Sequence, residues 1–211
     1  MNSALFRLDA PAFSGGCPEI VELYRQIPLA DPQNQIRVLA LNPATDYKDD
    51  IQCELEVIDV PQKVEDNNRG DYEAVSYAWG DISLTHRAYI GRRPLAITAN
   101  LDVALRHLRH YDWTRRLWID GICIDQSNSH EKSYQVQMLR RTFRYAFQSL
   151  IWLGVGDSST DYAIRRLNEL AHLKRQNDRR ISIQCDVDQV GDEALNEGLR
   201  EIFARPWWTR L

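Results

Sequence analysis

The alternation of predicted strands and helices from residue 72 onward constrains the fold more than any other feature of the sequence. Two apolar runs, RLWIDGICI (116–124) and SLIWLG (149–154), are predicted strands, and each follows a segment with the residue spacing of an amphipathic helix. The predicted helices cover residues 100–111, with Thr98 or Asn100 as the cap, and residues 128–147, 159–176 and 192–204. Strands that alternate with helices form parallel sheets covered on both faces, which explains why the two runs are apolar throughout.

Further β segments are predicted upstream of these elements. IRVLAL (36–41) and IQCELEVIDV (51–60) are separated by turn-forming residues, and the second alternates apolar and polar side chains, so we expect an antiparallel pair. YEAVSYAWG (72–80) predicts a buried strand, and residues 88–98 predict a small hairpin. The predicted fold class is therefore α/β: a parallel sheet flanked by helices, with an N-terminal antiparallel β pair and a β-hairpin insertion.

Bulk composition is that of an ordinary globular domain and argues against several function classes. The 211 residues are 44% hydrophobic and 27% charged, and the formal net charge is −4. A small and mixed charge favours neither nucleic acid nor a membrane surface as a partner. No apolar run approaches the roughly 18–20 residues of a membrane span, and the first residues lack the features of a signal peptide, so we expect a cytoplasmic protein.

The cysteines predict neither a metal site nor a disulfide framework. Cys17, Cys53, Cys123 and Cys185 lie far apart and form no CxxC pair. We therefore expect reduced thiols. Cys123 lies within a predicted buried strand, where a thiol is a poor nucleophile.

Polar residues occur within and directly after the predicted strand 116–124, and ligands of open parallel sheets bind beyond the carboxyl ends of strands. Asp120 lies inside this strand and, when buried, needs a partner such as an arginine or a backbone N–H group. Asp125 lies at its carboxyl end, where the carboxylate either caps the neighbouring loop or contacts a ligand. The sequence alone leaves both roles of Asp125 open.

The start of the helix that follows has its own explanation for an acidic residue. Asn128 and Glu131 have the spacing of a capping box, with asparagine in place of the usual serine or threonine. Helix capping therefore accounts for Glu131 without a ligand. We expect His130 to be an exposed residue of the first turn.

Four ordered blocks of the sequence resemble a known family, although the common phosphate-binding, nucleophile-elbow and zinc-protease motifs are absent. The blocks YEAVSYAWGD, ITANLDVALRHLR, RLWIDGICIDQSNSHEKSYQVQMLRRTFRYA and IWLG resemble the fungal heterokaryon-incompatibility (HET) domain. The resemblance covers residues 35–211, leaves residues 1–34 as an N-terminal arm, and implies an effector of fungal allorecognition that triggers programmed cell death after non-self fusion. Because the chain ends in RPWWTRL, we expect the domain to be truncated at its C-terminus.

The HET family is considered similar to TIR domains, which implies a flavodoxin-like order of strands. AVSYAWGD resembles the first TIR strand and its loop, LWIDGICIDQ the second, and SLIWLG the third. From this likeness and from the polar segment above, the candidate ligand-binding residues are Ser76, Tyr77, Trp79, Gly80, Asp81, Asp120, Asp125, Gln126 and Glu131.

Some TIR domains cleave NAD at the nicotinamide–ribose bond, with an essential glutamate on the helix after the third strand. The corresponding HET segment resembles RxWxxQE, so the resemblance places that glutamate beyond Leu211. A carboxylate there stabilises the oxocarbenium-like charge that develops on the ribose. No catalytic residue and no cofactor are therefore assigned within the chain, and NAD is the candidate substrate.

Two functions follow from the resemblance. The first is a signalling module that associates with itself or with other signalling domains. The second is an NAD glycohydrolase. The module is favoured because the expected catalytic glutamate lies beyond this sequence.

Overall fold

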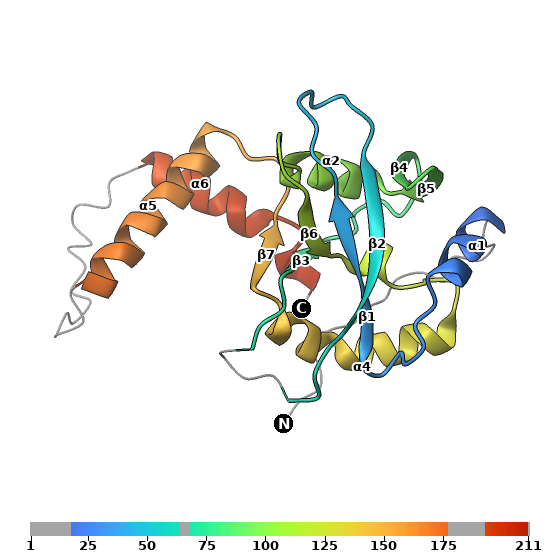
Figure 1. The fold of residues 1–211 in the computed structure, drawn as a ribbon. Coiled ribbons are helices and arrows are strands. Elements are labelled where there is room, and N and C mark those ends of the chain that lie inside the picture. Colours follow the sequence, from blue (N-terminus) through green and yellow to red (C-terminus); the bar gives the residue numbers. More distant parts are fainter. Residues whose placement is uncertain (1–17, 64–67, 177–192, 211) are drawn as a thin grey trace. The chain divides into compact units, whose positions relative to one another are not determined.

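The computed structural model describes residues 18–63, 68–176 and 193–210, and the chain divides into two compact units at Trp152 and Leu153. The first unit contains α1 (Pro18–Gln26), β1 (Gln35–Leu41), β2 (Gln52–Asp59), β3 (Glu73–Tyr77), β4 (His86–Ile90), β5 (Arg93–Ile97), α2 (Ala99–Leu108), β6 (Arg115–Trp118), α3 (Asp120–Cys123), α4 (Ser129–Tyr145) and β7 (Gln148–Trp152) (Figure 1). The second contains α5 (Ser158–Gln176), α6 (Glu193–Ala204) and a 3-10 turn (Trp208–Arg210).

All strands of the first unit form one mixed seven-stranded sheet in the order β5-β4-β2-β1-β6-β3-β7. The predicted antiparallel pair β1–β2 is confirmed, and β3 is parallel to both β6 and β7. The predicted hairpin β4–β5 is also present, but it extends the main sheet because β4 pairs in parallel with β2. The α/β class is therefore confirmed, with the hairpin as part of the sheet rather than a separate insertion.

The predicted strand 116–124 is wrong beyond Trp118. The chain enters the short helix α3 there, and the Ile119 carbonyl accepts hydrogen bonds from the N–H groups of Ile122 and Cys123. Asp120 therefore begins a helical turn instead of lying inside a strand. A short apolar run has the same composition in a buried helical turn as in a buried strand, so periodicity could not separate the two.

The expectation that 149–154 is a strand covered on both faces is also wrong. β7 is the last strand in the sheet order, and its residues are exposed or half-buried. Ile151 is 53% exposed. An edge strand can carry apolar residues without burial on both faces, because the surface of folded proteins contains much apolar area.

Helices α2 and α4 cover opposite faces of the parallel strands. Trp118 shares a face of the sheet with Ala74, and its ring meets Phe143 of α4 edge-on at 5.6 Å. Tyr77 is paired with Trp152 on the other face, where Asn100 of α2 reaches the Trp152 indole. Both helices begin at the predicted caps, since Thr98 accepts from the Leu101 N–H and Asn128 accepts from the Glu131 N–H.

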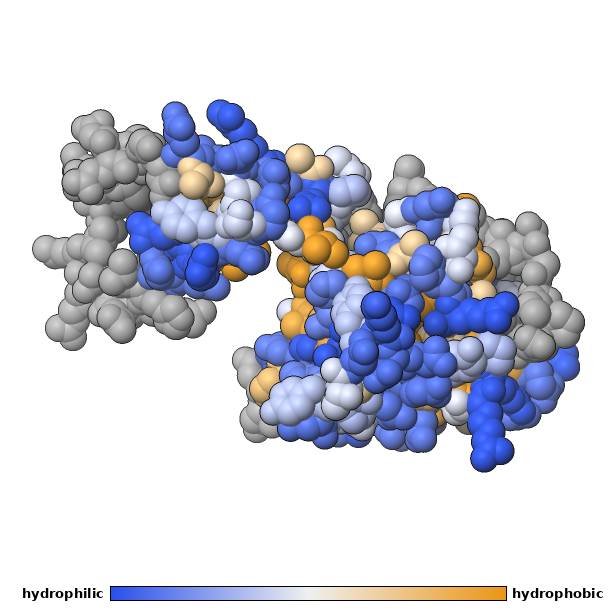
Figure 2. All heavy atoms as spheres, turned by 90° about the horizontal axis from the view of Figure 1, so that it is seen from above, coloured by the Kyte–Doolittle hydropathy of each residue, from blue (hydrophilic) through white to orange (hydrophobic). Residues whose placement is uncertain are grey.

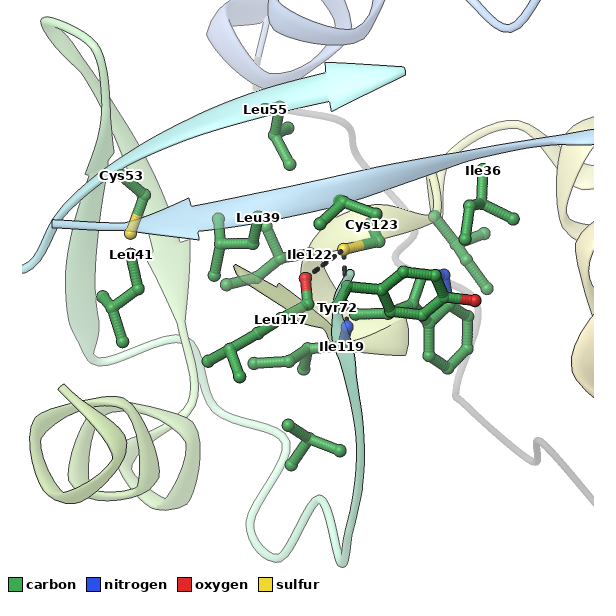
Figure 3. Close-up of a cluster of buried hydrophobic side chains, with 14 of the residues drawn as sticks. Ile36, Leu39, Leu41, Cys53, Leu55, Tyr72, Leu117, Ile119, Ile122 and Cys123 are labelled. Carbon is green, nitrogen blue, oxygen red and sulfur yellow. Dashed lines mark hydrogen bonds between the residues drawn. The ribbon is translucent and has the colours of Figure 1, made fainter. Parts of the chain in front are cut away.

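The core of the first unit lies between β1, β6 and the helices. Figure 3 shows Cys123 among Leu39, Leu117 and Ile122, with its sulfur bonded to the backbone of Leu117 and Ile119. In contrast, hydrophilic residues predominate among the coloured residues on the face that Figure 2 shows. No helix among residues 18–63, 68–176 and 193–210 is long and apolar enough to cross a bilayer.

The second unit is built on two helices that pack closely at a glycine. A Cβ atom added to Gly198 of α6 would lie 2.2 Å from the Ser159 carbonyl oxygen of α5, so only glycine allows this approach. Asp157 precedes α5 and accepts hydrogen bonds from the N–H groups of Ser159 and Thr160. The bond from the Thr160 N–H, followed by one from the Ser159 hydroxyl, holds the pKa of the Asp157 carboxyl well below its usual range, and together the bonds fix the start of the helix.

Candidate functional site

The parallel strands β3, β6 and β7 end at the same edge of the sheet, at Tyr77, Trp118 and Trp152. Along the chain these strands come first, second and third, but in the sheet the first lies between the other two. The chain therefore steps from β3 to one side and returns to the other side. In open α/β sheets this reversal leaves a site for ligands or partners beyond the strand ends.

Asn100 of α2 joins the two strand ends at this reversal. Its side-chain amide donates to the Ala78 carbonyl at 2.5 Å, just after β3. Its carbonyl oxygen accepts from the Trp152 indole N–H at 3.2 Å, at the end of β7. The ladder between β3 and β7 thus ends at Tyr77 and Trp152, and one half-buried amide bonds to the chain just after the first strand and at the end of the second.

The residues after β3 form one side of the edge. The Tyr77 and Trp79 rings are stacked, with centroids 6.4 Å apart, and both rings pack on the core. Gly80 has a φ of +67°, which favours glycine and turns the chain into the loop. Asp81 is exposed, and hydrogen bonds from the Ser83 N–H and hydroxyl lower the pKa of its carboxyl.

The α3 segment forms the other side. Asp120 is buried, and the Gln126 side-chain amide donates to its carbonyl at 2.8 Å. Gly121 lies against Tyr77, since a Cβ added there would be 2.5 Å from the Tyr77 hydroxyl oxygen. The structure thus brings Tyr77, Trp79, Asp120 and Gln126 to one end of the sheet.

The remaining acidic candidates are engaged in local and long-range bonds. The Asp125 carboxylate accepts from the N–H and hydroxyl of Ser127, which is the loop-capping arrangement. The Glu131 carboxylate turns inward and forms a bidentate ion pair with Arg37, at 2.6 and 3.0 Å. Ser76 precedes Tyr77 on β3, so the two side chains lie on opposite faces of the sheet.

Cys53 and Cys123 are free thiols in the part of the chain that the structure describes, and burial raises the pKa of each to about 12. Both therefore stay protonated and unreactive near neutral pH. Cys17 and Cys185 lie outside the described residues. Among the described residues, no three His, Cys, Asp or Glu side chains are grouped to hold a metal ion.

Comparison with known proteins gives one family. Residues 72–211 match the sequence model of the heterokaryon incompatibility protein (HET) family. Heterokaryon incompatibility protein 6, OR allele, of Neurospora crassa is 33% identical to the chain over 187 residues. The chain belongs to the heterokaryon-incompatibility family. The match covers 82% of this HET chain but 25% of the relative, and no solved structure matches.

The HET family match begins at residue 72, so α1, β1 and β2 precede it. These elements are nevertheless part of the first unit, because β1 and β2 lie inside the sheet and Tyr24 of α1 is buried in the core. The predicted boundary between an arm and a domain at residue 35 stays a prediction.

Sequence reasoning missed three residues that shape the candidate site. Asn100 was one of the two predicted caps of α2, but Thr98 is the cap, which leaves the Asn100 amide for tertiary contacts. Gly121 gave a signal, since a glycine in an apolar run often marks a close approach. Arg37, a charged residue in an otherwise apolar strand, implied a buried acidic partner.

Replacing Gly121 by alanine should destabilise the first unit by about 1–3 kcal/mol, because the new methyl group would overlap the buried Tyr77 hydroxyl. Urea denaturation measures the loss. The matched test adds Gly121→Ala to a Tyr77→Phe background, where the hydroxyl is gone and the penalty should largely disappear. An equal penalty in both backgrounds would show that the contact is not the cause.

Proposed function

We propose that this chain acts in heterokaryon incompatibility as an effector module that triggers programmed cell death after non-self fusion. In this proposal its polar loops contact further copies of the chain or other signalling domains. Family membership supports the process, and the relative's name refers to the same process. Because the chain spans about a quarter of that relative, the activity of the whole protein belongs to the proposal.

The observation that supports the module is that the Asp125 and Glu131 carboxylates are bonded to other groups of the protein. Both Glu131 oxygens are held by the Arg37 guanidinium, and Asp125 is bonded to Ser127. A carboxylate held in this way is poorly placed to exchange protons or to stabilise a developing charge on a substrate. It is well placed to give the loop one fixed shape, which is what a partner surface requires.

Induced expression in fungal hyphae tests the proposal. The native chain should cause loss of viability, scored by vital-dye uptake. His130→Glu should reduce killing if the start of α4 contacts a partner. The variant should still fold, because His130 is exposed and an acidic residue in the first turn interacts favourably with the helix dipole. His86→Glu, at an exposed position of β4, is the matched control and should kill like the native chain. Undiminished viability with the folded native chain present would reject the effector role.

A second candidate, NAD glycohydrolase activity, is favoured by the sheet edge at which β3, β6 and β7 end. Asn100 there joins two strand ends beside the Trp79 and Trp152 rings, and such an edge suits a nucleotide. The purified chain, and the encoded protein wherever it continues past Leu211, would be incubated with NAD, and nicotinamide release measured. Release that falls on Asn100→Ala supports the enzyme. Cell death without NAD loss supports the module alone.

A further inference from the structure

The N-terminal elements α1 and β1 are joined to the 120–131 loop through one buried guanidinium. Arg37 of β1 is 1% exposed, and its partner Glu131 is 94 positions away in sequence. The guanidinium also donates to the Ile27 carbonyl just after α1 and to the Cys123 carbonyl at the end of α3. One side chain therefore joins three segments that are remote in sequence.

Tyr24 of α1 reinforces this junction. Its hydroxyl donates to the Ile122 carbonyl of α3 at 2.7 Å, and its ring lies over the Arg37 guanidinium at 4.9 Å. Burial is the main cause that raises the pKa of the Tyr24 hydroxyl, so it remains a neutral donor. Both carbonyls at the end of α3 are thus held by residues that precede the family match.

The far end of the loop is held by the same pair. Glu131 does not reach back to the Asn128 N–H, which bonds to the Asp125 carbonyl instead. It accepts from the Asp125 N–H at 2.9 Å while it binds Arg37. The residues between Cys123 and Glu131, which include Asp125 and Gln126, are therefore anchored to Arg37 at both ends.

We propose that Arg37 is the positioning residue of the 120–131 loop, and that α1 and β1 set the loop's working shape as an integral part of the module. A buried ion pair adds little net stability compared with apolar residues of the same size, but it fixes one geometry. On this view a chain limited to the family match would hold the same polar residues without their orientation. The cellular consequence rests on the proposed effector function, whereas the loop's shape does not.

Hydrogen exchange measured by mass spectrometry tests the proposal in the whole chain. In Arg37→Met with Glu131→Gln, which removes both charges, backbone exchange over residues 119–131 should rise about tenfold or more while β2 stays protected. The matched control is Arg115→Met with Glu73→Gln. This ion pair also lies on the sheet, and Arg115 also binds a backbone carbonyl, that of Leu108. Burial alone would raise the pKa of the Glu73 carboxyl, but hydrogen bonds from Arg115 and Gln148 outweigh burial and lower it.

A milder pair of variants covers the case in which the double variant fails to fold. Tyr24→Phe removes only the hydroxyl that binds α3 and should speed exchange of the loop, whereas Tyr72→Phe removes a hydroxyl that binds the Thr142 carbonyl and should not. Native protection of 119–131 in Tyr24→Phe and in the folded double variant would overturn the proposal, as would equal acceleration in the controls.

The killing assay then separates this proposal from the proposed function. If the native chain kills, the Arg37/Glu131 double variant should kill less at equal folded amount, and the Arg115/Glu73 control should not. If the native chain does not kill, the effector role fails, while the exchange result still decides the role of Arg37. Native killing by a double variant with a loosened loop would overturn the functional half.

Discussion

Replacing Arg37 alone by methionine should cost about 3–5 kcal/mol of the free energy of unfolding, because Glu131 would be left as an uncompensated buried charge. The same change removes the donors for the Ile27 and Cys123 carbonyls. Denaturant titration followed by far-ultraviolet circular dichroism gives the loss.

The second substitution supplies the control. Changing Glu131 to glutamine in the Arg37→Met protein removes the stranded charge and should restore a large part of the stability. A loss below about 1 kcal/mol, or one that Glu131→Gln leaves unchanged, would contradict a buried ion pair.

Truncating Trp118 to alanine should destabilise the first unit by about 3–5 kcal/mol, the range for a fully buried large aromatic residue. Trp118 is 1% exposed and lies between the sheet and Phe143 of α4, so its removal leaves a cavity that the rigid sheet cannot close. Urea denaturation again measures the change.

Trp113→Ala is the matched control. Trp113 is 50% exposed and stacks on His110 at 3.7 Å, so its loss should cost under about 1 kcal/mol. Similar costs at both positions would mean that α4 does not pack on Trp118 as described.

Local patterns were sufficient for the elements that depend on near neighbours. β-rich composition predicted β1 and alternation predicted β2. Helical spacing predicted α2 and α4, with Thr98 or Asn100 as the cap of the first and Asn128 as the cap of the second. The end of β6 at Trp118 was missed because a buried helical turn and a buried strand look alike in composition. The edge position of β7 was missed because the sequence of one strand does not show which strands lie beside it in the sheet.

The candidate site, too, was predicted in part from the sequence and decided in part by tertiary contacts. The sequence placed Tyr77, Trp79 and Gln126 near strand ends, since parallel strands share a carboxyl edge. It could not show that Asn100 joins β3 to β7. Such a contact depends on where a helix lies over the sheet rather than on the residues beside it.

By itself the sequence determined the class of fold, the helix caps and the family resemblance, because periodicity and short motifs act between residues a few positions apart. Only the tertiary structure decided the partner of Glu131. The capping box predicted a local role for its side chain. Instead, the carboxylate lies in the core, where a buried charge needs an opposite charge from another part of the chain. Here the chain supplies it from β1.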